Sequence, residues 1–223
     1  MIALGSIIRD GKGYVYRTVS QIESLAERTE LTWILVEGDS TDGTKELLRD
    51  LVPDLSFRVK HAEFDHGGPK YGSINHPDRW WRISLTCNQV LERVGPDITH
   101  FIWVESDLIW QPETMLGLLD RLDSVDAVAP LSLSSDGWFY DIWGYRRNGQ
   151  MFRPYKPYYD GPIDEMVEID SAGSCIAMRG QIARAARFPT DPHDNDGIVG
   201  WCRNIRSLGY HIYLEPRLSV RHP

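Results

Sequence analysis

The sequence predicts a single α/β domain with a mixed, mostly parallel sheet flanked by helices. Short apolar runs recur along the chain, each too short for a buried helix but long enough for a buried strand. Segments with one apolar face at helical spacing separate these runs, and such alternation is typical of parallel strands joined by right-handed crossovers. A length of 223 residues fits one domain of ordinary size.

The first part of the chain is predicted to run strand, helix, strand, helix, strand. Its first strand opens the sequence, where a basic leader and a cleavage site are both missing, so no signal peptide is expected. The predicted segments are a strand at Ile2–Ile8, a helix between Val15 and Ala26, a strand at Trp33–Val36, a helix at Thr44–Leu51 and a strand near Phe57–Lys60.

A segment rich in Gly, Pro, Asn and Ser, residues 66–78, is predicted to be a loop. The alternation then resumes, and after Pro130 it gives way to a block of aromatic residues between Trp138 and Tyr159. The later predicted helices are Arg79–Val94, Pro112–Leu122 and Ile198–Leu208, and the later strands are Thr99–Val104, Ala127–Ala129, Val167–Ile169, Cys175–Met178, Tyr210–Leu214 and Leu218–Val220.

Composition restricts the class of protein. With 42% hydrophobic and 25% charged residues the chain resembles ordinary globular domains. The net charge of −8 disfavours broad binding to nucleic acid. No apolar run approaches the roughly 18 residues of a membrane span. The cysteines Cys87, Cys175 and Cys202 are odd in number and widely spaced, which predicts buried thiols in a cytoplasmic protein rather than disulfides or zinc ligands.

Two carboxylates directly follow the predicted buried strand that ends at Val104. Glu105 and Asp107 therefore lie at the carboxyl end of a strand, where open α/β sheets bind ligands. Pro112 follows at a position suited to the first turn of a helix. Oxygen ligands of this kind suit Mg²⁺ or Mn²⁺ carrying phosphates. The alternative is a turn whose two acids only face water.

A second acidic loop, Glu37 to Thr44, follows an earlier strand. Its carboxylates could contact a nucleotide base or ribose, while Ser40, Thr41 and backbone amides bind other polar atoms. Alternatively, the same residues only begin a helix, with Thr41 or Asp42 as N-cap.

These two stretches resemble the motifs of a known family. The segment from Val36 to Thr44 is similar to the first nucleotide-binding motif of family-2-like glycosyltransferases with the GT-A fold. Glu105-Ser-Asp107 resembles the metal-binding Asp-x-Asp of that fold, with Glu in place of the first Asp. The resemblance implies donor-nucleotide contacts from Glu37, Asp39, Glu105 and Ser106, and a metal held by Asp107 and Glu105.

Later segments extend the resemblance to the C-terminal part. The segment 170–179, which contains Gly173, is similar to the glycine-containing stretch that lines the acceptor side of such enzymes. The segment 194–203 resembles their acidic motif, closest to the form in fungal mannan-polymerase-type mannosyltransferases, with Asp194 and Asp196 in the acidic positions. The last strand resembles one whose histidine, here His222, completes the metal site. Asp194 or Asn195 could instead only cap a helix, and His222 could be a surface residue.

Roles for these residues follow from the resemblance. Asp196, or failing that Asp194, would be the general base that deprotonates an acceptor hydroxyl. In relatives that retain the anomeric configuration, the same acid would orient the acceptor. Asp107, Glu105 and His222 would hold Mn²⁺ or Mg²⁺, which acts as a Lewis acid towards a departing diphosphate.

Basic and aromatic residues could complete the site. Arg9 at the end of the first strand could reach the nucleotide, and Arg79 and Arg82 could bind phosphate at the start of a helix. The alternative for all three is a solvated surface position. In the aromatic block, Asp141 could accept hydrogen bonds from sugar hydroxyls, and rings could contact sugars through their faces. The acceptor-binding rings are predicted to be Trp138, Tyr140 and Trp143.

The aromatic block has two other interpretations. It could be a hairpin packed into the core, or its interleaved aromatic and basic residues could bind unstacked nucleic-acid bases.

The resemblance implies metal-dependent transfer of a hexose from a UDP- or GDP-hexose to a hydroxyl on a glycan, a protein or, less favoured, a modified nucleobase. Residues 1–107 would form the nucleotide half and residues 108–223 the acceptor half.

Two rival functions share this fold. A sugar-1-phosphate nucleotidyltransferase would carry a glycine-rich, basic phosphate loop after the first strand, and Arg9–Gly13 matches it poorly. A non-catalytic carbohydrate-binding protein would bind glycans without metal-dependent breakdown of nucleotide sugars.

Overall fold

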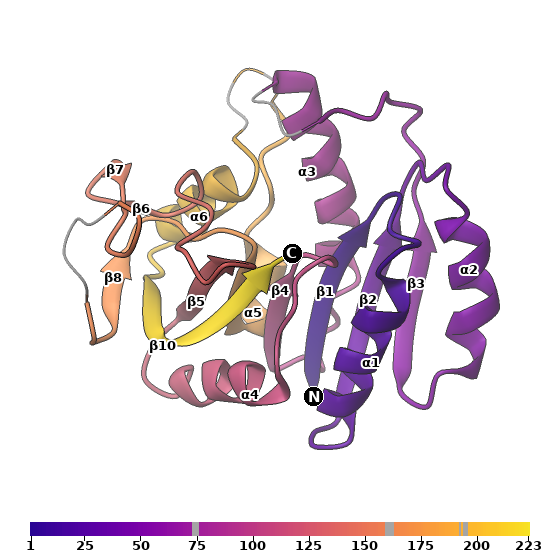
Figure 1. Ribbon diagram of the computed structural model, residues 1–223, viewed down its shortest axis with the longest axis horizontal. Coiled ribbons are helices and arrows are strands. Elements are labelled where there is room, and N and C mark those ends of the chain that lie inside the picture. The colour runs from indigo at the N-terminus through magenta and orange to yellow at the C-terminus, as the bar shows by residue number, and fades with distance from the viewer. Residues whose placement is uncertain (73–75, 159–162, 192, 194–195) are drawn as a thin grey trace.

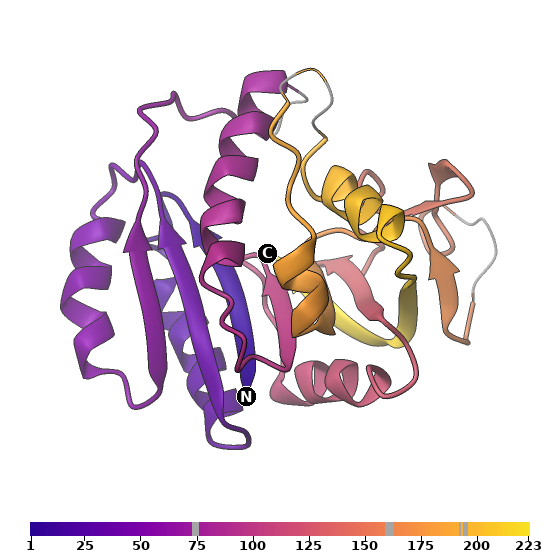
Figure 2. The ribbon, with the colours of Figure 1, turned by 180° about the vertical axis from the view of Figure 1, so that it is seen from behind.

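An eight-stranded mixed sheet forms the centre of the computed structural model, which describes residues 1–72, 76–158, 163–191, 193 and 196–223 (Figure 1). The strand order is β3-β2-β1-β4-β9-β5-β10-β8. Helices α1, α2 and α4 cover one face, and α3, α5 and α6 cover the other, as Figures 1 and 2 show from opposite sides. The predicted fold class, a single mostly parallel α/β domain, is confirmed.

The first part of the chain is the predicted series of parallel strands joined by helices. Strand β1 pairs in parallel with β2 on one side and β4 on the other, and β2 pairs in parallel with β3. The elements are β1 (Ile2–Ile8), α1 (Val15–Ala26), β2 (Leu31–Glu37), α2 (Thr44–Leu51), the short 3₁₀ helix η1 (Val52–Asp54) and β3 (Arg58–Glu63).

In the second part, two reversed strands make the sheet mixed: β9, and β8, which pairs antiparallel with the last strand β10. Strand β9 lies between β4 and β5 and is antiparallel to both, so β5 and the last strand β10 run parallel to β4. The elements are α3 (Pro77–Glu92), β4 (His100–Val104), α4 (Pro112–Arg121), β5 (Ala127–Ser134), β6 (Arg146–Arg147), β7 (Gln150–Met151), β8 (Val167–Ile169), β9 (Cys175–Arg179), α5 (Gly180–Ala185), α6 (Ile198–Ser207) and β10 (Ile212–His222).

The structure corrects two details of the sequence prediction. The strands expected at Tyr210–Leu214 and Leu218–Val220 are one strand, β10, whose pairing with β5 shifts register between Glu215 and Ser219. Pro216 lies in this interval, and proline has no N–H to contribute to a ladder. Helix α5 was not predicted, because six residues are too few to show a helical repeat.

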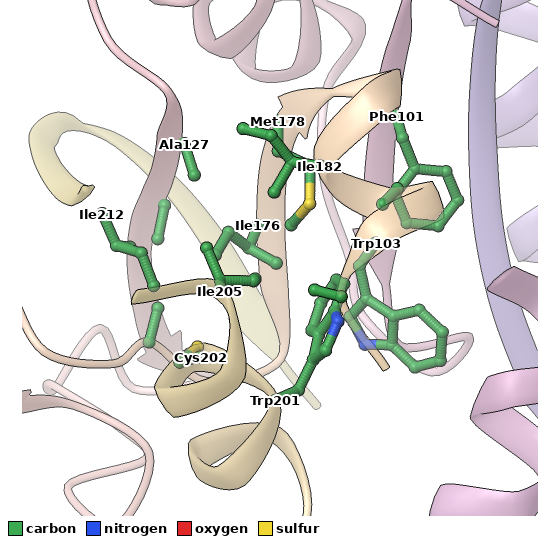
Figure 3. Packing of buried hydrophobic residues seen from close by; sticks show 14 of the residues in the cluster. Phe101, Trp103, Ala127, Ile176, Met178, Ile182, Trp201, Cys202, Ile205 and Ile212 are labelled. Atoms are coloured by element: carbon green, nitrogen blue, oxygen red, sulfur yellow. The ribbon is translucent and has the colours of Figure 1, made fainter. Parts of the chain in front are cut away.

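The core on the α3–α5–α6 face fixes the start of α6. Trp201 from α6 is fully buried, and its ring contacts Trp103 of β4 edge-on, with ring centroids 5.9 Å apart (Figure 3). Phe188 stacks on Trp201 at 4.6 Å. Buried aromatic rings of this size supply much of the packing energy of a core. This cluster therefore anchors the segment that leads into α6, where Asp196 lies.

Among the described residues, no helix is both long enough and apolar enough to cross a membrane. The three cysteines are free and buried, as predicted.

A buried carboxylate holds the bulge of β10. Glu215 is fully buried, and its side chain accepts hydrogen bonds from the guanidinium groups of Arg121 in α4, at 2.7 Å, and Arg217, at 2.8 Å. Burial opposes ionisation of Glu215, but the hydrogen bonds from Arg217 and Arg121 outweigh it and lower its pKa to about 2. Ionised Glu215 thus ties α4 to the last strand.

We predict that Glu215→Gln lowers the free energy of unfolding at pH 7 by about 2 kcal/mol, the usual worth of a hydrogen bond to a charged group. Because the folded pKa lies below the unfolded value, the contribution is present above about pH 4.5 and is lost as pH falls towards 2. Urea unfolding at pH 7 and pH 3 would measure both effects. Equal losses in the variant at the two pH values would contradict the assignment.

Candidate functional site

The carboxyl ends of six strands lie along one edge of the sheet. Strands β1, β2, β3, β4, β5 and β10 all run in the same direction, so the residues that follow or end them lie along this edge. In Figure 1 the end of β10 lies beside β4 and β1. Arg9, Glu105 and His222 are therefore brought together although they are far apart in the sequence.

A cavity of about 490 Å³ opens at this edge. It lies at the sheet edge where open α/β folds bind ligands, and its size is that of a small-molecule site. The predicted site residues that line it are Arg9, Arg82, Glu105, Ser106, Asp107, Tyr140, Asp141, Trp143, Asp196 and His222.

Glu105, Asp107 and His222 form a cluster of metal-ligand type. One ligand atom from each lies within 4.8 Å of the other two, and His222 Nε2 is 3.4 Å from Asp107 Oδ2. Ile109 and Arg221 exchange two backbone hydrogen bonds of 2.8 Å, which bring the last strand beside the acidic turn. These two bonds place His222 next to Asp107.

The electrostatics of Glu105 favour a nearby cation. Burial, followed by the charges of Asp107 and Asp141, raises the pKa of Glu105 to about 8, although a hydrogen bond with Ser174 and the charge of Arg79 oppose the rise. An ionised Glu105 beside Asp107 is therefore costly without added positive charge.

The donor set fits a hard divalent ion. Two carboxylates supply oxygen ligands of the kind that Mn²⁺ and Mg²⁺ prefer, and imidazole adds a nitrogen that first-row transition metals accept. Tyr140 stacks on the His222 ring, with centroids 4.4 Å apart and planes 21° from parallel, and so holds the imidazole in place.

Three arginines lie on the cavity. Arg9 donates to the carbonyl oxygens of Gly68 and Pro69 at 2.9 and 3.2 Å, and Arg82 donates to that of His66 at 3.0 Å. These two side chains thus hold the loop before α3 against the cavity.

The third arginine, Arg79, interacts with the Trp80 ring and with the charge of Glu105. Its guanidinium lies 4.3 Å from the centre of the Trp80 ring, and burial lowers its pKa despite the charge of Glu105. Arg9, Arg79 and Arg82 are half-buried and all three line the cavity.

The carboxylates of Glu37 and Asp39 contact protein groups rather than the cavity. Glu37 is fully buried and accepts from the backbone N–H of Ser40 at 2.9 Å, with Lys45 Nζ 3.5 Å away. Asp39 pairs with His66 at 2.7 Å. The structure therefore does not bring these two residues into the cavity lining, and their predicted nucleotide contacts stay predictions.

The rest of the Glu37–Thr44 loop leads into α2, as expected if this segment begins a helix. Gly43, with a left-handed φ of 90°, occupies the N-cap position instead of Thr41 or Asp42. Asp42 still satisfies the first turn, because it accepts from the backbone N–H of Thr44 at 3.0 Å.

Asp141 lies in a cradle made by two glycines. Its carboxylate accepts from the backbone N–H of Gly144 at 3.0 Å and also bonds Ser174. A Cβ atom at Gly173 would lie 1.4 Å from Asp141 Oδ2. Burial raises the pKa of Asp141 to about 6. Gly173, predicted to line the acceptor side, therefore acts by leaving space for this carboxylate.

The aromatic block divides between core and surface. Phe139 and Tyr145 are buried, whereas Tyr140 and Trp143 line the cavity and stay partly exposed. Trp138 is 44% exposed and is not part of the cavity lining. The two-residue strands β6 and β7 do form a hairpin, but their residues are exposed or half-buried, so this hairpin is not packed into the core.

Asp196 lines the cavity just before α6. Its Oδ1 lies 3.8 Å from Arg203 Nη1. The N-cap position of α6 is Gly197, which has no side-chain cap. Asp194 and Asn195 fall outside the described residues, so neither the catalytic nor the capping interpretation of Asp194 is tested.

Sequence reasoning did not identify Ser174, Gly144 or His66 as site residues. Ser174 bonds Asp141 and Glu105, and its carbonyl accepts from the Glu105 N–H at 2.9 Å. The small-residue run that contains Gly173 and Ser174 was the available signal, since such runs permit close approach of backbone and ligand groups.

Comparison with known proteins identifies the fold. The chain resembles a mannosyltransferase from Pyrobaculum calidifontis in complex with GDP-Man and Mn²⁺, with a TM-score of 0.66 and 15% identity over 99% of this chain and 56% of that one. It resembles Staphylococcus aureus TarS in complex with UDP-GlcNAc, with a TM-score of 0.60 and 13% identity over 99% and 57%. It also resembles a mycobacterial protein, with a TM-score of 0.55 and 16% identity over 100% and 67%.

These likenesses show a GT-A-type fold and no more, because all three identities are low. The chain spans just over half the length of the mannosyltransferase and of the TarS fragment 1–349. No protein-family model and no curated protein matches the sequence.

We predict that Gly173→Ala destabilises the protein by about 1–3 kcal/mol, the usual cost of overpacking, because the new methyl group overlaps the Asp141 carboxylate. Gly13→Ala is the matched control, since a Cβ there meets nothing within 4 Å. Urea unfolding measures both variants. Equal stability of the two would show that the cradle does not depend on Gly173.

Proposed function

We propose that the chain transfers a hexose from a UDP- or GDP-hexose to a hydroxyl acceptor and needs Mn²⁺ or Mg²⁺ to do so. The observation that carries this proposal is the meeting of Glu105, Asp107 and His222 on the cavity. GDP-Man with Mn²⁺ in the mannosyltransferase and UDP-GlcNAc in TarS, both of similar fold, support the donor class. The narrower resemblance to family-2-like and mannan-polymerase-type enzymes rests on the sequence motifs alone.

Asp107, Glu105 and His222 would hold the ion. A divalent ion there would supply positive charge to the diphosphate as it leaves the sugar. Asp107 and His222 are already adjacent, and Ser174 orients Glu105 through both its carbonyl and its side chain.

The arginines would bind the donor diphosphate. The Nη atoms of Arg9 and Arg82 now donate to neutral carbonyl oxygens, and phosphate oxygens would give stronger, charge-assisted bonds. Arg79, whose charge interacts with that of Glu105, lines the same cavity. Ser106 would complete this donor half, residues 1–107, and Glu37 and Asp39 would contact the nucleotide from the loop that their bonds to Ser40 and His66 hold in place.

The acceptor would occupy the part of the cavity formed by residues 108–223. Tyr140 and Trp143 offer ring faces to a sugar, and Asp141 offers a carboxylate fixed by Gly144 and Ser174. Trp138 would contact a longer acceptor outside the cavity. Asp196 would be the base that removes the hydroxyl proton, with Asp194 as the alternative.

The rival functions receive less support. For a nucleotidyltransferase, the loop after β1 should be free to cradle phosphates, but Asp10 in this loop accepts from the Thr41 N–H at 2.7 Å and pairs with Lys70 at 2.8 Å. For a non-catalytic carbohydrate-binding protein, the metal-ligand cluster would have no purpose. A nucleobase acceptor is disfavoured by the net charge of −8.

We predict that Asp107→Ala abolishes Mn²⁺-dependent binding of GDP or UDP. The native protein is first screened with nucleotide sugars, with and without Mn²⁺, because a ligand that binds the folded state raises the melting temperature. Calorimetry with the selected nucleotide then compares Asp107→Ala with the control Asp123→Ala, an exposed acid outside the cavity lining. Unchanged affinity in Asp107→Ala would remove the metal assignment.

We predict that Asp196→Asn preserves donor binding but lowers turnover by about 10²-fold or more, because the amide cannot accept the hydroxyl proton. Release of nucleoside diphosphate from the selected donor, with water as acceptor, measures turnover. Normal turnover in Asp196→Asn would exclude it as the base.

A further inference from the structure

One face of helix α1 binds the backbone of the acidic turn. Thr18 Oγ1 donates to the carbonyl oxygen of Ser106 at 2.6 Å, and Arg17 Nη2 donates to that of Asp107 at 2.6 Å. Gln21 Nε2 donates to the carbonyl oxygen of Leu108 at 3.2 Å. Three consecutive carbonyls of the turn are thus bound by three side chains of a single helix.

The spacing of these donors suits a helix. Arg17 and Gln21 are four residues apart, so they project from the same side of α1, and Thr18 lies beside them. Thr18 is buried within the apolar stripe of α1, where a valine would fill the same space. Its bond to Ser106 is shorter than the 3.2 Å contact with Tyr14 inside its own helix. The Thr18 hydroxyl therefore makes its shorter hydrogen bond to the acidic turn rather than to its own helix.

The turn needs external support because its two acids repel each other. The ligand atoms of Glu105 and Asp107 lie within 4.8 Å of each other, and repulsion between two carboxylates at this distance would drive them apart. Bonds to the backbone resist this separation without occupying the carboxylate oxygens. Arg17 also brings a positive charge to the carbonyl of Asp107, the residue whose carboxylate meets His222.

We propose that Arg17, Thr18 and Gln21 are positioning residues that hold the turn 106–108 so that Glu105 and Asp107 bind a divalent cation in one geometry. The inference rests on the metal site of the proposed function. Loss of groups that orient metal ligands through a second layer of bonds typically costs 10- to 100-fold in metal affinity. A similar loss is expected here.

Binding of Mn²⁺ alone, followed by the electron paramagnetic resonance signal of the free ion, tests the proposal without any activity assay. Arg17→Met should weaken Mn²⁺ binding about tenfold or more, and Arg17→Lys should recover part of the loss because it keeps a donor and the charge. Arg28→Met is the matched control, since Arg28 pairs with the exposed Glu113 away from the turn. It should bind Mn²⁺ as the native protein does.

A second pair of variants keeps the test decisive if Arg17→Met fails to fold. Thr18→Val should weaken Mn²⁺ binding, whereas Thr18→Ser should not, because only serine keeps the hydroxyl. Native affinity in folded Arg17→Met and Thr18→Val would overturn the positioning role while leaving the metal site intact. If the native protein itself binds no Mn²⁺, the metal site falls and the positioning role falls with it.

Discussion

The rest of the site depends on keeping two acidic side chains, Glu105 and Asp107, close together. Burial and the charge of Asp107 disfavour ionisation of Glu105 and raise its pKa to about 8. The apolar side of the turn compensates, since Leu108 and Trp110 are buried in the core shared with α1 and α4. Folding energy from that core therefore keeps the two acids in an arrangement that a divalent cation would stabilise.

The antiparallel strand β9, which lies between β4 and β5, makes this arrangement possible. β9 is antiparallel to both of its neighbours, β4 and β5, so β5 runs parallel to β4. β10 pairs in parallel with β5 and therefore ends at the same edge of the sheet as β4. The bridge between Ile109 and Arg221 then sets the register of the last residues against the turn. The distance of 3.4 Å between His222 and Asp107 follows from sheet topology rather than from any local motif.

Local patterns predicted most of the fold and many of the residues that line the cavity. The alternation of strand-like and helix-like segments up to Glu105 was sufficient to predict the parallel strands. The acid-x-acid turn indicated the edge of the sheet at which the cavity lies. Contacts between distant segments could not be predicted, because periodicity shows which face is apolar but not what that face meets. Thr18 illustrates this limit: its position in an apolar stripe gave no indication that its hydroxyl binds Ser106. Motif resemblance likewise did not show that the Glu37 carboxylate binds Ser40 and Lys45.

Charge is divided along the chain in a way that suits group transfer. Among the described residues lining the cavity, every lysine and arginine precedes residue 107, and every aspartate and glutamate comes at or after Glu105. In a transfer reaction negative charge leaves the acceptor oxygen and accumulates on the departing group. Electrostatic interactions are stronger in a partly buried cavity than in water. Cations from the first half would then stabilise the leaving group, while Asp141 and Asp196 would attract the hydroxyl proton, so each half of the chain favours one end of the reaction.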